Sequence, residues 1–314
     1  MSPRTRAWLP WLALAVVYVV WGSTYLAIAV VVKEQPPMAA AALRFLAAGV
    51  VMSVIAAVAD RAHPRPTRRQ IADYAFVGVL LLAFGNAFVM WSEKRIPSGI
   101  AALVVATVPL WLTLLDGFRR DGQAWTVRGW AGTAIGLAGV ALVARPEGGV
   151  SAGHWWAIGA LQLATLAWTV GSLYAQSLPK RLPLFSAAAV EMVAGGLALL
   201  VQSWIFREDW SAFAGASARS WWALAYLAVF GSLIAFTSFA YCLNELPAST
   251  VGTYAYVNPV VAVFLGHVFL REPLSPSLLA GALLIVAAVA LTTLRQPAPP
   301  RPASLPAGAS PAPD

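Results

Sequence analysis

The chain has 314 residues, of which 60% are hydrophobic and 11% are charged, and its formal net charge is +8. Soluble domains carry about 25% charged residues, so this composition excludes an ordinary water-soluble fold. A basic chain can bind nucleic acid, but here the basic residues lie in short loops between apolar stretches, where they set membrane orientation. We therefore expect an integral membrane protein without a nucleic-acid partner.

Ten apolar stretches are long enough to cross a bilayer. A hydrocarbon core of ~30 Å requires about 20 helical residues, and the alternation that marks barrel strands is absent. Backbone groups in lipid must be satisfied within each span, so the predicted fold class is an all-α membrane protein with ten transmembrane helices. The predicted spans are 11–32, 37–59, 74–92, 98–116, 127–145, 155–177, 184–205, 221–243, 249–270 and 276–294.

The first span is predicted to be a retained helix. Arg4 and Arg6 precede it as in a signal peptide, but it is too long and has no clear small-residue cleavage site. Trp21, Ser23 and Tyr25 lie several residues inside this span. Interfacial anchoring suits a tryptophan at that depth less well, so Trp21 either lines a pocket or packs in the bundle interior.

The second and seventh spans each contain one ionisable residue, Arg44 and Glu191, at matched positions. Ionisable groups at membrane depth are costly and indicate function by default. Arg44 can hold a substrate carboxylate through a bidentate contact, and Glu191 can bind an amine or carry a coupling proton. The alternative is that each side chain snorkels toward its nearer membrane surface. A direct ion pair between them would require both side chains to be extended.

Proline and glycine mark the fourth and fifth spans. Pro97 opens the fourth helix, where a missing N–H costs nothing, and Pro109 inside it predicts a kink. Gly132 and Gly136 form a GxxxG pattern in the fifth span, and Gly139 follows one turn later. This pattern favours close helix packing. We expect a monomer in which the fifth span contacts the tenth, with homodimerisation as the alternative.

Polar and aromatic residues recur in later spans. Trp168 and Ser172 lie in the sixth span, at the position that Trp21 and its neighbours have in the first. In the ninth span, Tyr254 and Asn258 share one helix face at i, i+4 spacing. Asn86 lies in the third span. Amide and hydroxyl groups at membrane depth need partners, so we expect these side chains to face the bundle interior.

The two halves of the chain resemble each other. Residues 36–49, PPMAAAALRFLAAG, align with residues 183–196, PLFSAAAVEMVAGG, at an offset of 147. A proline spacing also recurs, and the pairs are Pro97 with Pro109 and Pro247 with Pro259. Repeats of this length in an apolar chain predict a transporter built from two similar halves, with its site at their interface.

The predicted repeats span residues 1–150 and 151–296, five helices each. Because five is odd, the second repeat must start from the opposite side of the membrane, which predicts an inverted repeat. With the N-terminus inside, the inside loops hold thirteen Lys and Arg residues and the outside loops seven, so both termini are predicted to be cytoplasmic. The Pro/Ala-rich tail, 297–314, cannot bury a core and is expected to be disordered.

Four segments carry a family signature: WGSTY at 21–25, ALRFLAAG at 42–49, PSGIAALVVATVPLW at 97–111 and ASTVGTYAYVNPVVA at 248–262. They resemble the EamA family of the drug/metabolite transporter superfamily, over residues 8–294. The resemblance implies a ten-helix carrier of the bacterial inner membrane, and many such carriers export amino acids or related metabolites. It therefore implies the fold and the general activity better than the cargo.

The sequence thus predicts a secondary transporter that exports a small metabolite, an amino acid or related compound, by alternating access. No Walker motif is present, so direct ATP drive is not expected. A sugar-phosphate or nucleotide-sugar carrier is the alternative, although phosphate favours several buried cations and only Arg44 is available. A membrane-embedded enzyme would need clustered catalytic groups, which are absent, so we expect no enzyme activity.

No cofactor is expected, the lone Cys242 excludes an internal disulfide, and no Cys/His spacing indicates a metal site. A channel would need rings of like charge or a filter-like loop, and neither is visible. The candidate substrate-binding residues are Trp21, Ser23, Tyr25, Arg44, Asn86, Trp168, Ser172, Glu191, Tyr254 and Asn258.

Overall fold

A computed structural model describes residues 3–116, 127–143, 154–178, 182–246, 251 and 254–293, and every regular element in these ranges is a helix. Elements labelled η are π-helical segments. In chain order the elements are α1 (Pro3–Val31), α2 (Pro37–Ala59), α3 (Arg68–Gly78), η1 (Val79–Asn86), α4 (Ala87–Glu93), α5 (Ser98–Val105), α6 (Val108–Asp116), α7 (Val127–Val143), α8 (Trp155–Ser177), α9 (Leu184–Ile205), α10 (Ala212–Gly215), α11 (Ala218–Tyr226), η4 (Leu227–Ile234), α12 (Ala235–Glu245), α14 (Tyr254–Leu270) and α15 (Pro276–Thr293).

Each predicted span overlaps a helix. Among the described residues, six helices are long and apolar enough to cross a membrane: Trp8–Val31, Pro37–Ala59, Arg68–Glu93, Trp155–Ser177, Leu184–Ile205 and Ala218–Cys242. Four shorter apolar helices accompany them: Ser98–Leu112, Gly129–Val143, Val257–Leu270 and Pro276–Ala288. The all-α membrane class is therefore confirmed, whereas the count of ten spans in two repeats stays a prediction. The predicted repeat boundary and the tail lie outside the described residues.

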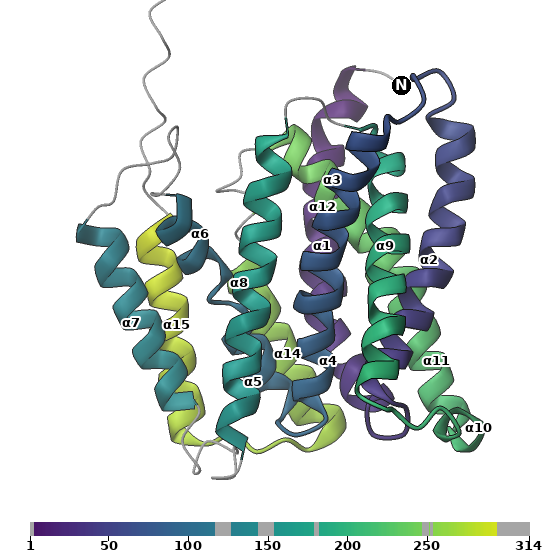
Figure 1. The fold of residues 1–314 in the computed structure, drawn as a ribbon. Coiled ribbons are helices and arrows are strands. Elements are labelled where there is room, and N and C mark those ends of the chain that lie inside the picture. Colours follow the sequence, from purple (N-terminus) through teal and green to yellow (C-terminus); the bar gives the residue numbers. More distant parts are fainter. Residues whose placement is uncertain are drawn as a thin grey trace, which may run out of the picture.

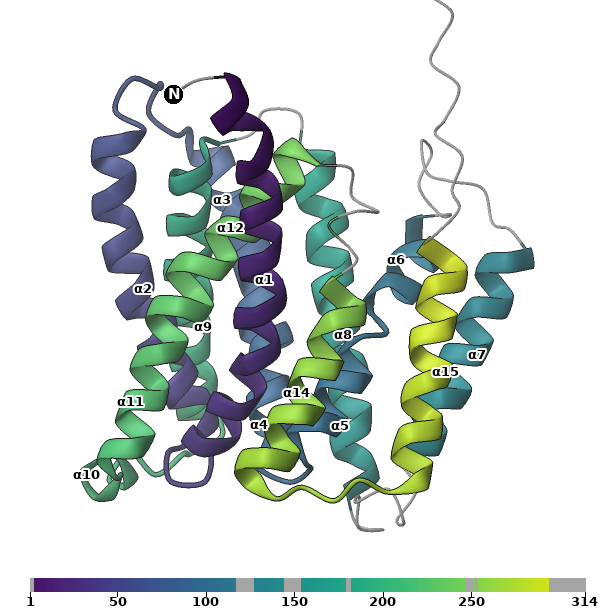
Figure 2. The ribbon, with the colours of Figure 1, turned by 180° about the vertical axis from the view of Figure 1, so that it is seen from behind.

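The helices stand side by side in one bundle, with α7 and α15 at one edge and α2 and α11 at the opposite edge (Figures 1 and 2). Glycines allow α7 and α15 to approach closely. A Cβ atom at Gly139 would lie 2.9 Å from the carbonyl oxygen of Gly281, and a Cβ at Gly281 would lie 2.8 Å from that of Gly139. The predicted contact between the GxxxG helix and the last span is confirmed.

The fourth span is broken rather than kinked. Pro97 is the N-cap residue of α5, as predicted. A two-residue turn then separates α5 from α6, and Pro109 lies in the first turn of α6, where a proline needs no N–H. The predicted kink at Pro109 within a continuous helix is therefore wrong. Pro259 does lie inside α14, and Pro247 lies outside the described residues.

The third span of each half contains an eight-residue π-helical segment. These segments, η1 and η4, begin at residues 79 and 227, which is within one residue of the sequence offset of 147. π-Helical turns are rare and occur frequently at functional sites. They place Asn86, Gly231 and Ser232 in the middle of the bundle.

Carboxylates at helix ends cap helices of the other half. Glu208, after α9, accepts hydrogen bonds from the backbone N–H groups of Met38 (3.0 Å) and Ala39 (2.8 Å) at the start of α2. Asp60, after α2, accepts one from the N–H of Ser186 (2.8 Å) at the start of α9. Helices α2 and α9 thus exchange caps, which satisfy N–H groups that have no partner within the helix.

Two further caps lie at the end of the bundle that carries α10, called the α10 end below (Figure 1). Glu34 accepts from Ser217 at the start of α11, through its N–H (2.6 Å) and its hydroxyl (2.9 Å). These hydrogen bonds hold the pKa of Glu34 below its ordinary range, and the bond from the backbone N–H has the larger effect. Glu272 accepts from the N–H groups of Ser98 (2.8 Å) and Gly99 (3.1 Å) at the start of α5. Three carboxylates therefore join the two halves at the α10 end.

Glu208→Ala should destabilise the protein by about 1 kcal/mol, because removal of a helix cap costs ~0.5–2 kcal/mol. The readout is thermal unfolding of the purified protein in detergent. Glu245→Ala, at an exposed position at the end of α12, is the matched control and should leave the melting temperature unchanged. Equal losses in the two variants would contradict the capping role.

Candidate functional site

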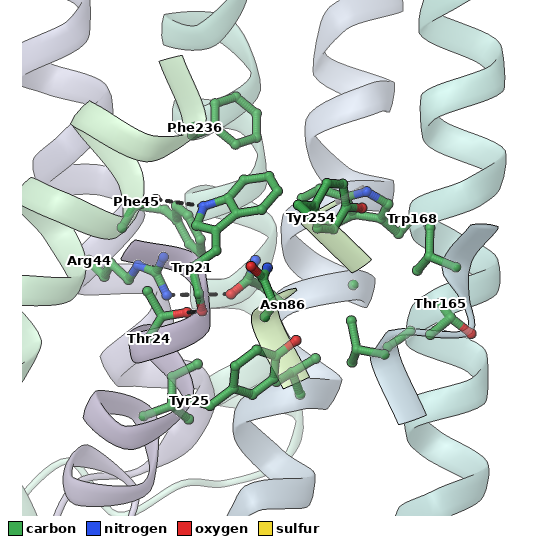
Figure 3. Close-up of a pocket in the computed structure, with 18 residues that line it drawn as sticks. Trp21, Thr24, Tyr25, Arg44, Phe45, Asn86, Thr165, Trp168, Phe236 and Tyr254 are labelled. Atoms are coloured by element: carbon green, nitrogen blue, oxygen red, sulfur yellow. Dashed lines mark hydrogen bonds between the residues drawn. The ribbon is translucent and has the colours of Figure 1, made fainter. Parts of the chain in front are cut away.

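A central cavity lies between helices from both halves of the sequence (Figure 3). The cavity has a volume of about 90 Å³, against the ~10–15 Å³ that one water needs on the same measure, so it has room for several waters or a small molecule. None of the described lining residues belongs to α7, α9 or α15. The lining residues are Trp21, Thr24, Tyr25, Ile28, Arg44, Phe45, Gly85, Asn86, Val89, Val105, Val108, Ala164, Thr165, Trp168, Gly231, Phe236, Tyr254 and Asn258.

The structure brings most of the sequence-predicted residues together at this cavity. Those that line it are Trp21, Tyr25, Arg44, Asn86, Trp168, Tyr254 and Asn258. Three others lie elsewhere. The hydroxyl of Ser23 is hydrogen-bonded to that of Tyr226 (2.6 Å), Ser172 is half-buried on α8, and Glu191 is buried in α9 against Gly78. That any of the ten binds substrate stays a prediction.

Sequence reasoning missed several lining residues. Thr24 and Phe45 are direct neighbours of predicted residues, and Thr165 lies one turn before Trp168 on α8. Helical periodicity applied to the predicted residues would have found Thr165, because positions three apart share a face. Gly231 has no side chain and gives no such signal.

Arg44 is buried, with 4% of its surface exposed, and its guanidinium group reaches the cavity. Its Nε donates to the hydroxyl of Ser232 (2.8 Å), its Nη1 makes a long contact with Oδ1 of Asn86 (3.4 Å), and the group lies 4.5 Å from the centre of the Phe45 ring. In the part of the chain that the structure describes, no hydrogen bond joins Arg44 to Glu191. The predicted alternative of a direct ion pair is therefore not seen.

The two π-helical segments hold Arg44 in place. Asn86 is the last residue of η1, and Ser232 belongs to η4. The Ser232 hydroxyl also contacts the carbonyl oxygen of Leu227, five residues earlier, which is the spacing of a π-helix (3.2 Å). Gly231 permits the close approach, because a Cβ atom there would lie 3.0 Å from Nη2 of Arg44. The partners of the guanidinium group among the described residues are thus all neutral.

Aromatic rings form one wall of the cavity (Figure 3). The ring of Trp21 lies 5.8 Å from that of Trp168, 5.4 Å from that of Tyr254 and 4.8 Å from that of Phe239. The first two contacts are edge-to-face, the preferred geometry for aromatic pairs. The indole N–H of Trp21 donates to the carbonyl oxygen of Gly231 (3.3 Å). Trp21 therefore both lines the cavity and packs in the interior.

The cavity combines one cation with an apolar, aromatic wall and a few hydroxyl and amide groups. No acidic residue is among the described residues that line it. A buried charge is costly unless it is compensated, so an anionic group entering the cavity would be stabilised beside Arg44. No group of three or more His, Cys, Asp or Glu residues within the described ranges is arranged to hold a metal ion.

Known proteins match the chain over nearly its whole length. The sequence model of the EamA-like transporter family matches residues 8–145 and 155–294. The chain is 39% identical over 294 residues to the uncharacterized inner membrane transporter YedA of Escherichia coli K12, covering 93% of each chain. It is 26% identical to the uncharacterized transporter YvbV of Bacillus subtilis, covering 94% of each. A crystal structure with 22% identity has a TM-score of 0.65 over 90% of this chain and 96% of that one, which shows the fold alone.

Proposed function

The chain belongs to the EamA-like transporter family, and on that premise we propose that it exports a small metabolite carrying a carboxylate, an amino acid or a related compound, across the bacterial inner membrane. The transporter role and the multi-pass inner-membrane location follow from the family and from the inner-membrane relative. The cargo class is the proposal. The observation that carries it is Arg44, a buried cation that faces the cavity without an acidic partner in the lining.

A carboxylate suits this site for geometric reasons. Two of the five guanidinium N–H donors are engaged by neutral oxygens of Ser232 and Asn86, which leaves donors for a bidentate contact. The aromatic wall of Trp21 and Trp168 suits an apolar side chain and also the face-on approach of an amine. An amino acid carries all three features: a carboxylate, an amine and a side chain.

A phosphate-bearing cargo is the second candidate and is less well supported. A doubly charged phosphate favours several buried cations, whereas Arg44 is the sole cation among the described lining residues. An enzyme would need a nucleophile with a neighbouring base, and the described lining residues include no His, Cys, Asp or Glu.

Alternating access is supported by features that match between the halves. The π-helical segments occupy equivalent positions, and α2 and α9 exchange carboxylate caps at opposite ends of the bundle. Both features suit two inverted repeats that rock around a central site. Residues between the cavity and the α10 end of the bundle are tightly buried. Val32, Gln35 and Met38 are each 1% exposed. We propose that the α10 end is the closed gate in this conformation.

Topology provides a direct test of the inverted repeat. Reporter fusions or cysteine labelling should place the 60–72 loop and the C-terminal tail in the cytoplasm, because the basic residues favour that side. The 206–217 segment at the α10 end should lie outside and serves as the control. Finding the 60–72 loop and the tail on opposite sides of the membrane would remove the inverted-repeat proposal.

Cargo is tested by comparing metabolites in the medium of cells with and without the protein. Overexpression should raise extracellular levels of one or a few amino acids or related carboxylates. Cells that contain the Arg44→Ala variant should behave like cells without the protein. Selective release of phosphorylated sugars or nucleotides would favour the second candidate instead.

A further inference from the structure

Glu93, the last residue of α4, is a buried carboxyl group that is not among the described residues lining the central cavity. Only 6% of its surface is exposed, and neither carboxyl oxygen has a hydrogen-bond partner among the described residues. Its surroundings are tightly packed. Ser92 is fully buried and donates to the carbonyl oxygen of Ala157 on α8 (3.0 Å), which fixes the end of α4 against that helix.

The nearest basic residues in sequence turn away from Glu93. Arg95 donates to the carbonyl oxygen of Trp91 (2.6 Å), and its guanidinium carbon lies 4.0 Å and 4.7 Å from the ring centres of Trp91 and Trp156. Lys94 is exposed. Neither of these sequence neighbours therefore supplies a counter-charge, and Glu93 forms no ion pair within the described residues.

The titratable and charged groups around Glu93 come from several elements. Two titratable groups of other elements lie within electrostatic range of Glu93: Tyr25 on α1 and Glu272 beyond α14. Arg44 on α2 contacts the same span at Asn86, about two helical turns before Glu93. The ring of His154, before α8, packs edge-to-face against that of Trp156, with 6.4 Å between the ring centres. The environment is therefore apolar or negative, which disfavours an ionised carboxylate and favours one that holds a proton.

Glu93 lies along the chain between the cavity and the cap at the α10 end. Val89, one turn before it on α4, lines the cavity, and Glu272 caps the first turn of α5, the next helix, through Ser98 and Gly99. Ionisation of Glu93 would add a second negative charge within electrostatic range of Glu272 and weaken that cap. A proton on Glu93 removes this repulsion, so proton occupancy favours the closed α10 end.

We propose that Glu93 is a proton-binding site of the transport cycle, placed between the cavity and the cap that Glu272 forms at the α10 end. The proposal rests on the transporter function proposed above. In the cycle, the carboxylate takes a proton from water when the α10 end is open, and the neutral carboxyl group is occluded when that end closes. The proton is released to water when the opposite end opens, so the proton enters the cell as the cargo leaves it.

Infrared spectroscopy of the purified full-length protein in nanodiscs tests proton binding without any cargo. The background is Glu191→Gln, which removes the other buried carboxyl group of the described spans. In this background, the C=O stretch of a protonated carboxyl group should be present at neutral pH and should be lost on adding Glu93→Gln. Glu93→Asp should retain a shifted band, and Glu245→Gln, at an exposed position, should leave the band unchanged.

Absence of the band in the Glu191→Gln background, or its persistence when Glu93→Gln is added, would overturn the proposal. Coupling is tested in proteoliposomes that contain a pH-sensitive dye, with an equimolar mixture of the standard amino acids as the probe. Wild-type protein should move protons in the direction opposite to the amino acids, and Glu93→Gln should exchange amino acids without proton movement. Proton movement that persists in Glu93→Gln would also overturn the proposal. If no amino acid moves in either protein, the proposal of an amino-acid cargo is contradicted. The infrared result then decides alone whether Glu93 binds a proton.

Discussion

Arg44→Ala should abolish transport while leaving folded protein in the membrane. Hydrogen bonds to charged groups contribute about 1.5–3 kcal/mol each, so loss of a bidentate contact should weaken cargo binding by at least about tenfold. Arg44→Lys should restore little activity, because an ammonium group lacks the planar fork that matches a carboxylate. Efflux from cells and exchange in proteoliposomes are the readouts.

The matched control for Arg44 is Arg61→Ala, which removes the same side chain at an exposed position after α2. It should transport like the wild type. Size-exclusion profiles in detergent establish that each variant is folded. Normal transport by folded Arg44→Ala protein would show that the cation is structural and that the aromatic and amide groups bind the cargo alone.

Gly78→Ala should destabilise the protein strongly, because α3 crosses α9 at this residue. A Cβ atom there would lie 2.6 Å from the Cα of Glu191 and closer still to its carbonyl oxygen, so the two backbones would have to separate. Overpacking of this kind typically costs ~1–3 kcal/mol. Thermal unfolding in detergent should show a clearly lower melting temperature.

Gly159→Ala is the matched control, because it makes the same change inside α8 where no atom lies within 4 Å of the added Cβ. Alanine is favoured over glycine inside a helix by ~0.5–1 kcal/mol, so this variant should be slightly more stable than the wild type. The melting temperature should therefore fall in Gly78→Ala and rise slightly in Gly159→Ala. Equal melting temperatures for Gly78→Ala and the wild type would contradict the tight crossing of α3 and α9.

Much of the fold could be predicted because the length of the apolar segments and the recurring prolines at helix starts are visible in the sequence. The starts of α2, α5 and α9 at Pro37, Ser98 and Leu184 agree with the predicted spans 37–59, 98–116 and 184–205 to the residue. The break between α5 and α6 was not predicted, since a proline at position 109 is equally compatible with a kink and with a new helix start. The π-helical segments have no sequence signal of their own.

The candidate site was predicted in part, and the misses have a physical cause. Polarity at membrane depth indicated that Asn86 and Asn258 face the interior, and both line the cavity. Depth alone does not give helix rotation, so Ser172 and Glu191 were placed at a cavity that their helix faces do not reach. Glu93 was not predicted as a buried group, because it follows the predicted span 74–92 directly and precedes Lys94 and Arg95. In the sequence it therefore resembles a charged residue of a loop.

Counterflow in proteoliposomes tests the central claim most directly, that the cavity beside Arg44 moves a carboxylate-bearing metabolite. Vesicles loaded with the unlabelled metabolite identified in the cell comparison should take up its labelled form, and the matching amide or ester without a carboxylate should not compete. Uptake should be lost in Arg44→Ala vesicles and retained in Arg61→Ala vesicles. Equal competition by the uncharged analogue, or uptake that is unchanged in Arg44→Ala vesicles, would contradict the account.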